Sequence, residues 1–143
     1  HFILSKIDVS FSTFCPNFDC EWILGNHSDE LTPWIPYLAL YNSCKFFVLP
    51  CCFWDFERLM QFGRIPDHKE GRYRRYLKYI YRIGELCGFD EIETENLRIP
   101  STKYIAFVSR TRSTMDPVEC IQNLQEIANC TRIQNVPNDS QVF

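Results

Sequence analysis

The sequence predicts an α/β fold in which successive strands are joined by helical, parallel crossovers. Short apolar runs alternate with longer segments of helical periodicity, in the order strand, helix, strand, helix and a closing pair of strands. The run at residues 45–49, Lys-Phe-Phe-Val-Leu, is almost continuously apolar, as strands of parallel sheets are. At 143 residues with 45% hydrophobic content, the chain is long enough to bury a sizeable core in one domain.

The first half of the chain contains two predicted strands and one predicted helix. Residues 1–19 hold two apolar pieces that no pattern assigns to an element. Residues 20–25 form a short apolar run that is typical of a buried strand. An apolar helix is expected over 31–41, with Pro33 near its first turn, where a missing N–H group is harmless. The strand at 45–49 follows.

The second half is predicted to carry a long helix and then a strand pair. A loop over 55–70 leads to a helix at 72–87 that has one apolar face. Gly88 stands where a left-handed C-cap belongs. Two strands are expected at 91–99 and 103–109, around a tight turn.

Residues 111–143 are predicted to be an amphipathic helix followed by a loose tail. Asp116 and Pro117 match a helix cap and a first helical position, and Glu119 lies where the partner in a capping box belongs. The tail is expected to begin at residue 131. The sequence contains no internal repeat and no low-complexity stretch.

The charge distribution gives no global signature of nucleic-acid binding. The formal net charge is −3, so any RNA contact would depend on local patches. One basic stretch is interleaved with tyrosines, as in surfaces that hold RNA backbone and bases, although a charged helix face is commonly just solvated. Its cations are Lys69, Arg72, Arg74, Arg75, Lys78 and Arg82. The acidic run at 90–95 would end any such basic track.

The eight cysteines are an even number, which a secreted disulfide-bonded domain would also show. Their positions favour free thiols, because Cys51 and Cys52 are adjacent in an apolar run and Cys87 lies on an apolar helix face. No segment has the order of a signal peptide, and no apolar stretch is long enough to span a bilayer. We therefore expect a reduced, cytoplasmic protein without membrane contact, with the secreted disulfide domain as the alternative.

A dense set of polar residues follows the first predicted strand, from Gly25 to Glu30. Ligand sites in open α/β sheets lie outside the carboxyl ends of strands, so this segment is a candidate ligand site. The alternative is a surface turn that begins a helix, because Ser28 and Asp29 are both good capping residues.

This segment, Ile23-Leu-Gly-Asn-His-Ser-Asp-Glu-Leu-Thr-Pro-Trp-Ile-Pro36, resembles the signature of the eukaryotic tRNA (uracil-O2'-)-methyltransferases. Two further blocks match in the same order, Lys45-Phe-Phe-Val-Leu-Pro-Cys-Cys-Phe53 and Leu97-Arg-Ile-Pro-Ser-Thr-Lys103. The resemblance covers roughly residues 20–110. It implies a Rossmann-like class I methyltransferase sheet, mostly parallel with a C-terminal antiparallel strand, and S-adenosyl-L-methionine as cofactor. The implied reaction is methylation of the ribose 2'-OH of uridine-44 in serine tRNA.

Against that family, residues 1–110 look like the C-terminal half of the methyltransferase domain. The chain has only five glycines and no Gly-X-Gly turn after a strand, so the usual adenosine-cradling loop is missing. We expect the N-terminal half of the same domain to be a partner and this fragment alone to be inactive. A non-catalytic RNA- or partner-binding module remains the alternative function.

The resemblance places the acceptor atom at the end of the strand that precedes Asn26. Transfer to a hydroxyl needs aligned groups and a proton acceptor within hydrogen-bond reach. The candidate catalytic residues are Asn26, His27 and Asp29, with Asp29 as the preferred base and His27 as the second choice.

Candidate cofactor contacts are Gly25, Asn26, Trp34 and Pro50, and Trp34 has core packing as its alternative role. The segment from Pro50 to Phe53 is expected to form a pocket wall. No metal is expected, because adjacent cysteines lack the separation that metal ligands usually have. The turn before the last strand offers phosphate contacts, or is an ordinary solvated hairpin tip. The predicted RNA contacts are Glu30, Arg98, Ser101, Thr102, Lys103, Arg72 and Arg75.

Overall fold

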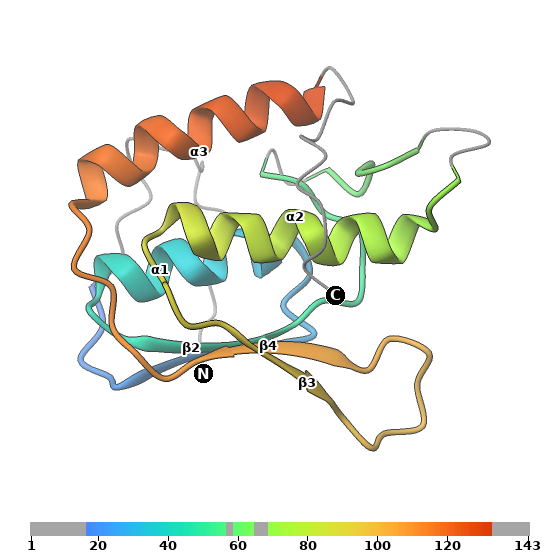
Figure 1. Ribbon diagram of the computed structural model, residues 1–143, viewed down its shortest axis with the longest axis horizontal. Helices are drawn as coiled ribbons and strands as arrows, with labels where there is room; N and C mark the ends of the chain where they lie inside the picture. Colours follow the sequence, from blue (N-terminus) through green and yellow to red (C-terminus); the bar gives the residue numbers. More distant parts are fainter. Residues whose placement is uncertain (1–16, 57–58, 65–68, 133–143) are drawn as a thin grey trace.

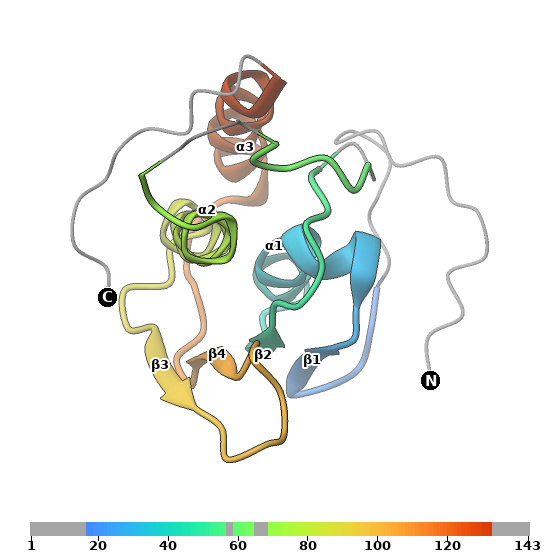
Figure 2. The same ribbon diagram turned by 90° about the vertical axis from the view of Figure 1, so that its right-hand side faces the viewer.

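The structure is a computed structural model that describes residues 17–56, 59–64 and 69–132. A four-stranded sheet forms one layer, and all three labelled helices lie on the same side of it (Figures 1 and 2). Helices α1 and α2 pack over the sheet, and α3 lies across them as an outer layer (Figure 2). The predicted α/β class is therefore confirmed.

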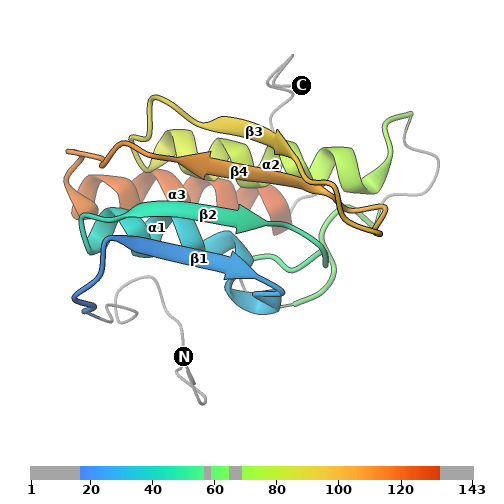
Figure 3. The same ribbon diagram turned by 90° about the horizontal axis from the view of Figure 1, so that it is seen from below.

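The sheet has the strand order β1-β2-β4-β3. Strands β1 (Trp22–Asn26) and β2 (Lys45–Leu49) are parallel neighbours. Strand β4 (Ile105–Ser109) is antiparallel both to β2 and to β3 (Glu93–Asn96). Three strands thus point one way, and the last strand runs in reverse between β2 and β3 (Figure 3).

The strand directions can be compared with the sequence-based expectation. Three of the four strands point the same way and the last strand is antiparallel, as expected. Only one of the three neighbouring pairs is parallel, because β4 lies between β2 and β3. The strand bounds agree within a few residues, and β2 spans the predicted 45–49.

The first helical segment starts earlier than predicted and is divided into two kinds of helix. A 3₁₀ helix, η1 (Asp29–Trp34), precedes α1 (Ile35–Tyr41). Pro33 lies inside the 3₁₀ helix and Pro36 in the first turn of α1. Because two prolines lack N–H donors here, the chain forms a tight turn before regular α-helix begins.

The two longer helices follow the sequence patterns closely. Helix α2 (Arg72–Leu86) has its C-cap at Cys87, and Gly88 adopts a φ of +81°, the left-handed conformation expected at this position. Helix α3 (Pro117–Arg132) begins after Asp116, whose Oδ1 accepts a hydrogen bond from the Val118 backbone N–H at 3.0 Å. The predicted tail starts two residues too early, and residues 133–143 lie outside the described residues.

The core lies between the sheet and the helices and is rich in aromatic rings. Phe46 of β2 meets Phe89 edge-on at 4.9 Å, and Phe62 stacks on Tyr79 of α2 at 4.6 Å. Aromatic pairs of this kind add specific geometry to hydrophobic burial. The core therefore fixes β2 and α2 relative to each other. Within the described ranges, no helix combines the length and apolar character needed to cross a bilayer.

Candidate active-site cleft

A cleft of about 490 Å³ lies at the edge of the sheet where β1 and β2 end. Its walls come from the ends of these two strands, from the segment after β2 and from the connection between β3 and β4. The lining residues are Asn26, His27, Phe47, Leu49, Cys51, Leu97, Ile99, Pro100, Ser101 and Lys103. This volume falls within the range of small-molecule sites in proteins.

The strand register explains why distant segments meet in this cleft. Asn26 pairs with Leu49, so β1 and β2 end side by side. Strand β4 begins near the same edge, because Phe107 pairs with Val48 in the antiparallel register. The connection that carries Ser101 and Lys103 therefore returns to the ends of β1 and β2.

Four polar side chains that the sequence singled out line the cleft together: Asn26, His27, Ser101 and Lys103. The polar turn after β1 and the tip that carries Lys103 therefore line the same cleft. The remaining lining is mostly apolar, which is the usual composition of a ligand pocket with a few convergent polar groups.

The polar turn has an unusual backbone. His27 and Asp29 have positive φ values of 49° and 44°, a left-handed conformation that costs energy for a residue other than glycine. A hydrogen bond of 2.8 Å between the hydroxyls of Ser28 and Thr32 holds the turn against η1. The backbone N–H of Leu31 also donates to the carbonyl of Ser28 at 2.8 Å. Such retained strain is typical of functional turns.

Gly25 has a packing role directly before this turn. A Cβ atom at Gly25 would lie 2.8 Å from Cγ1 of Ile35 and 3.0 Å from Oγ of Ser28. Only glycine allows β1 to approach the start of α1 this closely. The position therefore fixes the direction in which Asn26 and His27 leave the strand.

Asp29 is not among the residues that line the cleft. Its carboxylate lies beside the Cys51–Cys52 pair, and the ligand atoms of these three residues are all within 4.8 Å of one another. The two sulfurs are 3.8 Å apart. Burial, then the hydrogen bond and charge of Cys52, and then the charge of Asp29 raise the pKa of Cys51 to about 11. Cys51 is therefore a neutral thiol near pH 7, unlike a nucleophilic or metal-binding thiolate.

The predicted cofactor contacts separate into two groups. Asn26 lines the cleft, but Gly25 and Pro50 are buried and do not line it. Trp34 has no exposed surface and meets Phe56 edge-on at 5.3 Å. The interpretation of Trp34 as a ligand-stacking residue is therefore corrected, because its ring fills the core.

The predicted RNA contacts near the β3–β4 connection are also divided. Ser101 and Lys103 line the cleft. Arg98 and Thr102 are exposed residues of the same connection but do not line the cleft, and Glu30 is half-buried in η1. Oγ of Ser101 accepts a hydrogen bond from the Lys103 backbone N–H at 3.1 Å, which orders the tip.

Much of the basic stretch at the start of α2 has structural contacts. Nε of Arg72 donates to the Phe62 carbonyl at 2.7 Å, and Nη2 of Arg75 donates to the Gly63 carbonyl at 2.8 Å. These bonds fasten the preceding loop to the helix. Along the same helix, Arg74 and Lys78 form ion pairs with Glu70, and Arg82 forms one with Glu85.

Phe53 lies near the cleft and makes two contacts that the sequence does not predict. From the sequence it is expected only to be part of a pocket wall. The guanidinium carbon of Arg72 lies 4.1 Å from the centre of its ring, and Nζ of Lys103 lies 4.9 Å from the same centre. Both distances are within the range of cation–π interaction. Phe53 therefore connects the start of α2 with the tip that carries Lys103.

The cleft also has an apolar lining that the sequence patterns do not predict. Phe47 and Leu49, two residues apart on β2, both line the cleft, and so do Leu97 and Ile99 in the connection after β3. The run at 45–49 is almost continuously apolar, so the sequence does not show which of its residues face the cleft. Of the expected pocket wall from Pro50 to Phe53, only Cys51 lines the cleft.

Six cysteines whose side chains the structure describes, Cys20, Cys44, Cys51, Cys52, Cys87 and Cys120, are free thiols. Two further pairs lie close together, with sulfur–sulfur distances of 3.5 Å for Cys20 and Cys44 and 3.4 Å for Cys87 and Cys120. Cys44, Cys87 and Cys120 are buried, whereas Cys20 is exposed.

Comparison with known proteins gives consistent results. A human protein named "Probable tRNA (uracil-O(2)-)-methyltransferase" is 48% identical over 97 residues, which cover 66% of this chain. A mouse protein of the same name is 45% identical over 110 residues, or 76% of this chain. The tRNA (uracil-O(2)-)-methyltransferase of Schizosaccharomyces pombe is 35% identical over 114 residues, also 76% of this chain.

The matched segment is a small part of each relative. It spans 12% of the human protein, 15% of the mouse protein and 22% of the yeast protein. No family model matches the chain. No solved structure matches it either.

Proposed function

We propose that this chain, which belongs to the tRNA (uracil-O(2)-)-methyltransferase family, forms the acceptor side of a site that methylates a ribose 2'-OH in tRNA. By resemblance the acceptor is uridine-44 of serine tRNA, and S-adenosyl-L-methionine is the methyl donor. We further propose that the described sheet is the C-terminal half of a Rossmann-like class I methyltransferase domain, with its N-terminal half as partner, in a cytoplasmic protein.

The observation that carries this proposal is the convergence of Asn26, His27 and Lys103 in one cleft. A ribose hydroxyl needs a hydrogen-bonding group to orient it and a proton acceptor within reach. The phosphate next to that ribose needs a cation. The cleft offers all three kinds of group at the ends of two parallel strands, where α/β sheets bind ligands.

The described residues fit the acceptor better than the cofactor. Among the predicted cofactor contacts, only Asn26 lines the cleft, while Trp34 and Gly25 are committed to packing. The chain also has no Gly-X-Gly turn to cradle an adenosine. These residues do not make a complete cofactor site, so the adenosine must be held by residues outside the described part of the chain.

The chain's own residues would act on the acceptor ribose. His27 lines the cleft, so it is better placed than Asp29 to accept the hydroxyl proton, which reverses the order expected from the sequence. Asn26 can orient the hydroxyl through its amide. Lys103 can pair with the adjacent phosphate. This alignment of reacting groups is the main contribution that a rigid cleft makes to catalysis.

Methyl transfer by the full-length protein tests the proposal. Serine tRNA is incubated with S-adenosyl-L-methionine that carries a labelled methyl group, and the modified nucleotide is mapped. We expect label at the ribose of uridine-44 and none in a matched tRNA with a 2'-deoxy nucleotide at that position. Label on a base, or unchanged labelling of the deoxy substrate, contradicts ribose methylation.

A non-catalytic RNA-binding module is the second candidate, favoured by the incomplete set of cofactor contacts. The two functions differ in their response to S-adenosyl-L-methionine. A full-length protein that binds tRNA but shows no heat of binding with S-adenosyl-L-methionine, and no methyl transfer, would support the module.

A further inference from the structure

The ring of Phe53 makes cation–π contacts with two side chains from different parts of the chain. Arg72 comes from the first turn of α2, and Lys103 comes from the connection between β3 and β4. Phe53 itself lies in the segment after β2, half-buried against the core. Lys103 also lines the cleft, so this contact is continuous with the candidate active site.

The surroundings hold Phe53 and Arg72 firmly in place. Phe53 meets Tyr76 of α2 edge-on at 5.6 Å, and its carbonyl accepts a hydrogen bond from the Phe62 N–H at 3.1 Å. Arg72 is tied to the Phe62 carbonyl at 2.7 Å. The ring therefore belongs to the rigid part of the molecule.

The start of β4, two residues after Lys103, is tied to the same helix. The hydroxyl of Tyr73 accepts a hydrogen bond from the Ile105 backbone N–H at 3.3 Å. With the 3.1 Å bond from the Lys103 N–H to Ser101, this fixes the backbone on both sides of the lysine. A lysine side chain has a flexible stem, so the contact with the Phe53 ring is what restricts its ammonium group.

The two cations have no carboxylate partner among the described residues. Nη2 of Arg72 is buried and has no hydrogen-bond partner in this part of the structure. Burial, and then the charges of Arg64 and Arg75, lower the pKa of Arg72. A local excess of positive charge remains beside Lys103, and an anion bound there would offset it.

We propose that Phe53 is a positioning residue that holds Lys103 on the wall of the cleft beside Arg72, so that the paired cations attract a phosphate of the tRNA backbone. This inference rests on the proposed function, because that function supplies an RNA substrate. The inference adds Phe53 to that function, as the residue that positions the Lys103 ammonium group. The phosphate is the one next to the ribose in the cleft, since Asn26 and Lys103 line the same cleft.

A double-mutant cycle in the full-length protein tests the coupling. Phe53→Leu removes the ring and keeps an apolar side chain of similar size. We expect it to weaken tRNA binding about two- to fivefold, the equivalent of an exposed cation–π contact. We also expect the salt dependence of binding to fall by about one phosphate contact, as for Lys103→Ala. The double variant should bind no more weakly than Lys103→Ala alone, whereas additive losses would overturn the proposal.

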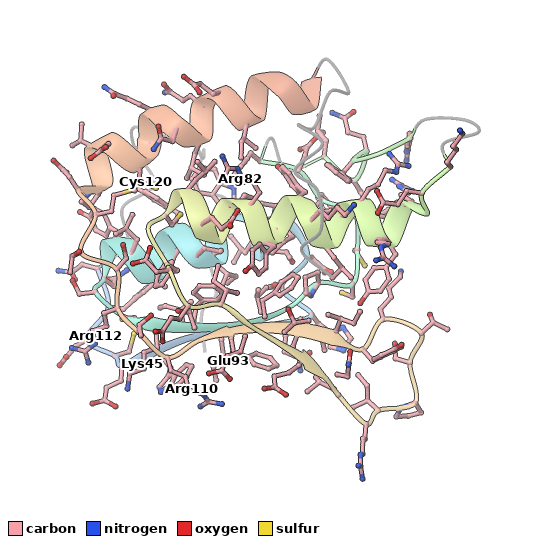
Figure 4. The ribbon with its side chains drawn as sticks, in the orientation of Figure 1. Lys45, Arg82, Glu93, Arg110, Arg112 and Cys120 are labelled. Atoms are coloured by element: carbon pink, nitrogen blue, oxygen red, sulfur yellow. The ribbon has the colours of Figure 1, made fainter. Side chains whose placement is uncertain are left out.

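A second cation–π pair provides a matched control. Nζ of Lys45 lies 5.5 Å from the centre of the Trp22 ring, at the starts of β2 and β1. Figure 4 shows Lys45 beside Arg110 and Glu93, at the end of the sheet away from the cleft. Trp22→Leu should leave tRNA affinity and its salt dependence unchanged. Phe53→Tyr keeps an aromatic ring at this position, so it should bind tRNA with the affinity and salt dependence of the wild-type protein. A loss in Phe53→Tyr as large as that in Phe53→Leu would count against the proposal.

A measurement without RNA separates positioning from general stability. After reductive methylation with ¹³C, the Lys103 methyl signal should be shifted upfield by the Phe53 ring, and the shift should vanish in Phe53→Leu. An unshifted Lys103 signal in the wild-type protein overturns the inference. Wild-type protein that binds tRNA with intact coupling but transfers no methyl group would contradict the proposed function alone. Normal methyl transfer with additive binding losses would contradict the inference alone.

Discussion

Asn26, the last residue of β1, lies directly opposite Leu49, the last residue of β2, in the parallel register of the sheet. This single pairing brings the polar turn after β1 and the cysteine-containing segment after β2 to the same edge. The reversed strand β4 then returns the Lys103 tip to that edge. The cleft is therefore a consequence of strand register and of one antiparallel strand.

The first prediction concerns the proton acceptor. His27 lines the cleft and Asp29 does not, so His27→Gln should lower the rate of methyl transfer by about 10²- to 10⁴-fold, as expected for a general base. Asp29→Asn should reduce the rate much less. Single-turnover transfer in the full-length protein measures both, with tRNA affinity checked in parallel. Equal losses in the two variants, or a larger loss in Asp29→Asn, would restore Asp29 as the base.

The second prediction concerns the close approach at Gly25. Gly25→Ala places a Cβ atom 2.8 Å from Ile35, so we expect it to reduce the free energy of unfolding by about 1–3 kcal/mol, as overpacked sites do. Gly71→Ala is the matched control, because no atom lies within 4 Å of a Cβ at that position. Urea denaturation measures both. Equal stability of the two variants would show that the β1–α1 contact tolerates a side chain.

The third prediction concerns alkaline pH. The pKa of Cys51 is raised to about 11 in the folded protein, above the ordinary value of 9.0. Between these values the unfolded chain releases the thiol proton and the folded chain keeps it, so stability should fall as pH rises from 9 to 11. Cys51→Ala should lessen that fall in stability, measured by denaturation at each pH. Identical pH profiles for the variant and the wild type would refute the assignment.

The fourth prediction concerns metal binding at Asp29, Cys51 and Cys52. Their ligand atoms lie within 4.8 Å of one another, but the thiols are adjacent in sequence and Cys51 is protonated near neutral pH. Added Co²⁺ should therefore produce no thiolate-to-cobalt absorption at pH 7. A band that appears in the wild type and disappears in Cys51→Ser would establish a metal site and contradict the expectation from sequence.

Local patterns predicted the elements that depend on local physics. The apolar run at 45–49 is β2, and the periodicity at 72–87 with Gly88 after it gives α2 and its left-handed cap. The polar turn and the Lys103 tip share a cleft because both lie at strand ends, which strand polarity alone could indicate.

Features that depend on strand register and tertiary packing could not be predicted from local sequence patterns. The insertion of β4 between β2 and β3 is decided by sheet pairing. His27 and Asp29 both have positive φ values, which the sequence does not show, and of the two only His27 lines the cleft. Trp34 stands next to the polar turn in sequence, but the 3₁₀ turn carries its ring into the core.

The most direct test of the account is a photo-crosslink from serine tRNA that carries 4-thiouridine at position 44, applied to the full-length protein and mapped by mass spectrometry. If the cleft binds the acceptor nucleotide, crosslinks should fall on Asn26 or His27, or on the tip from Leu97 to Lys103. Crosslinks confined to regions outside these two segments would contradict it.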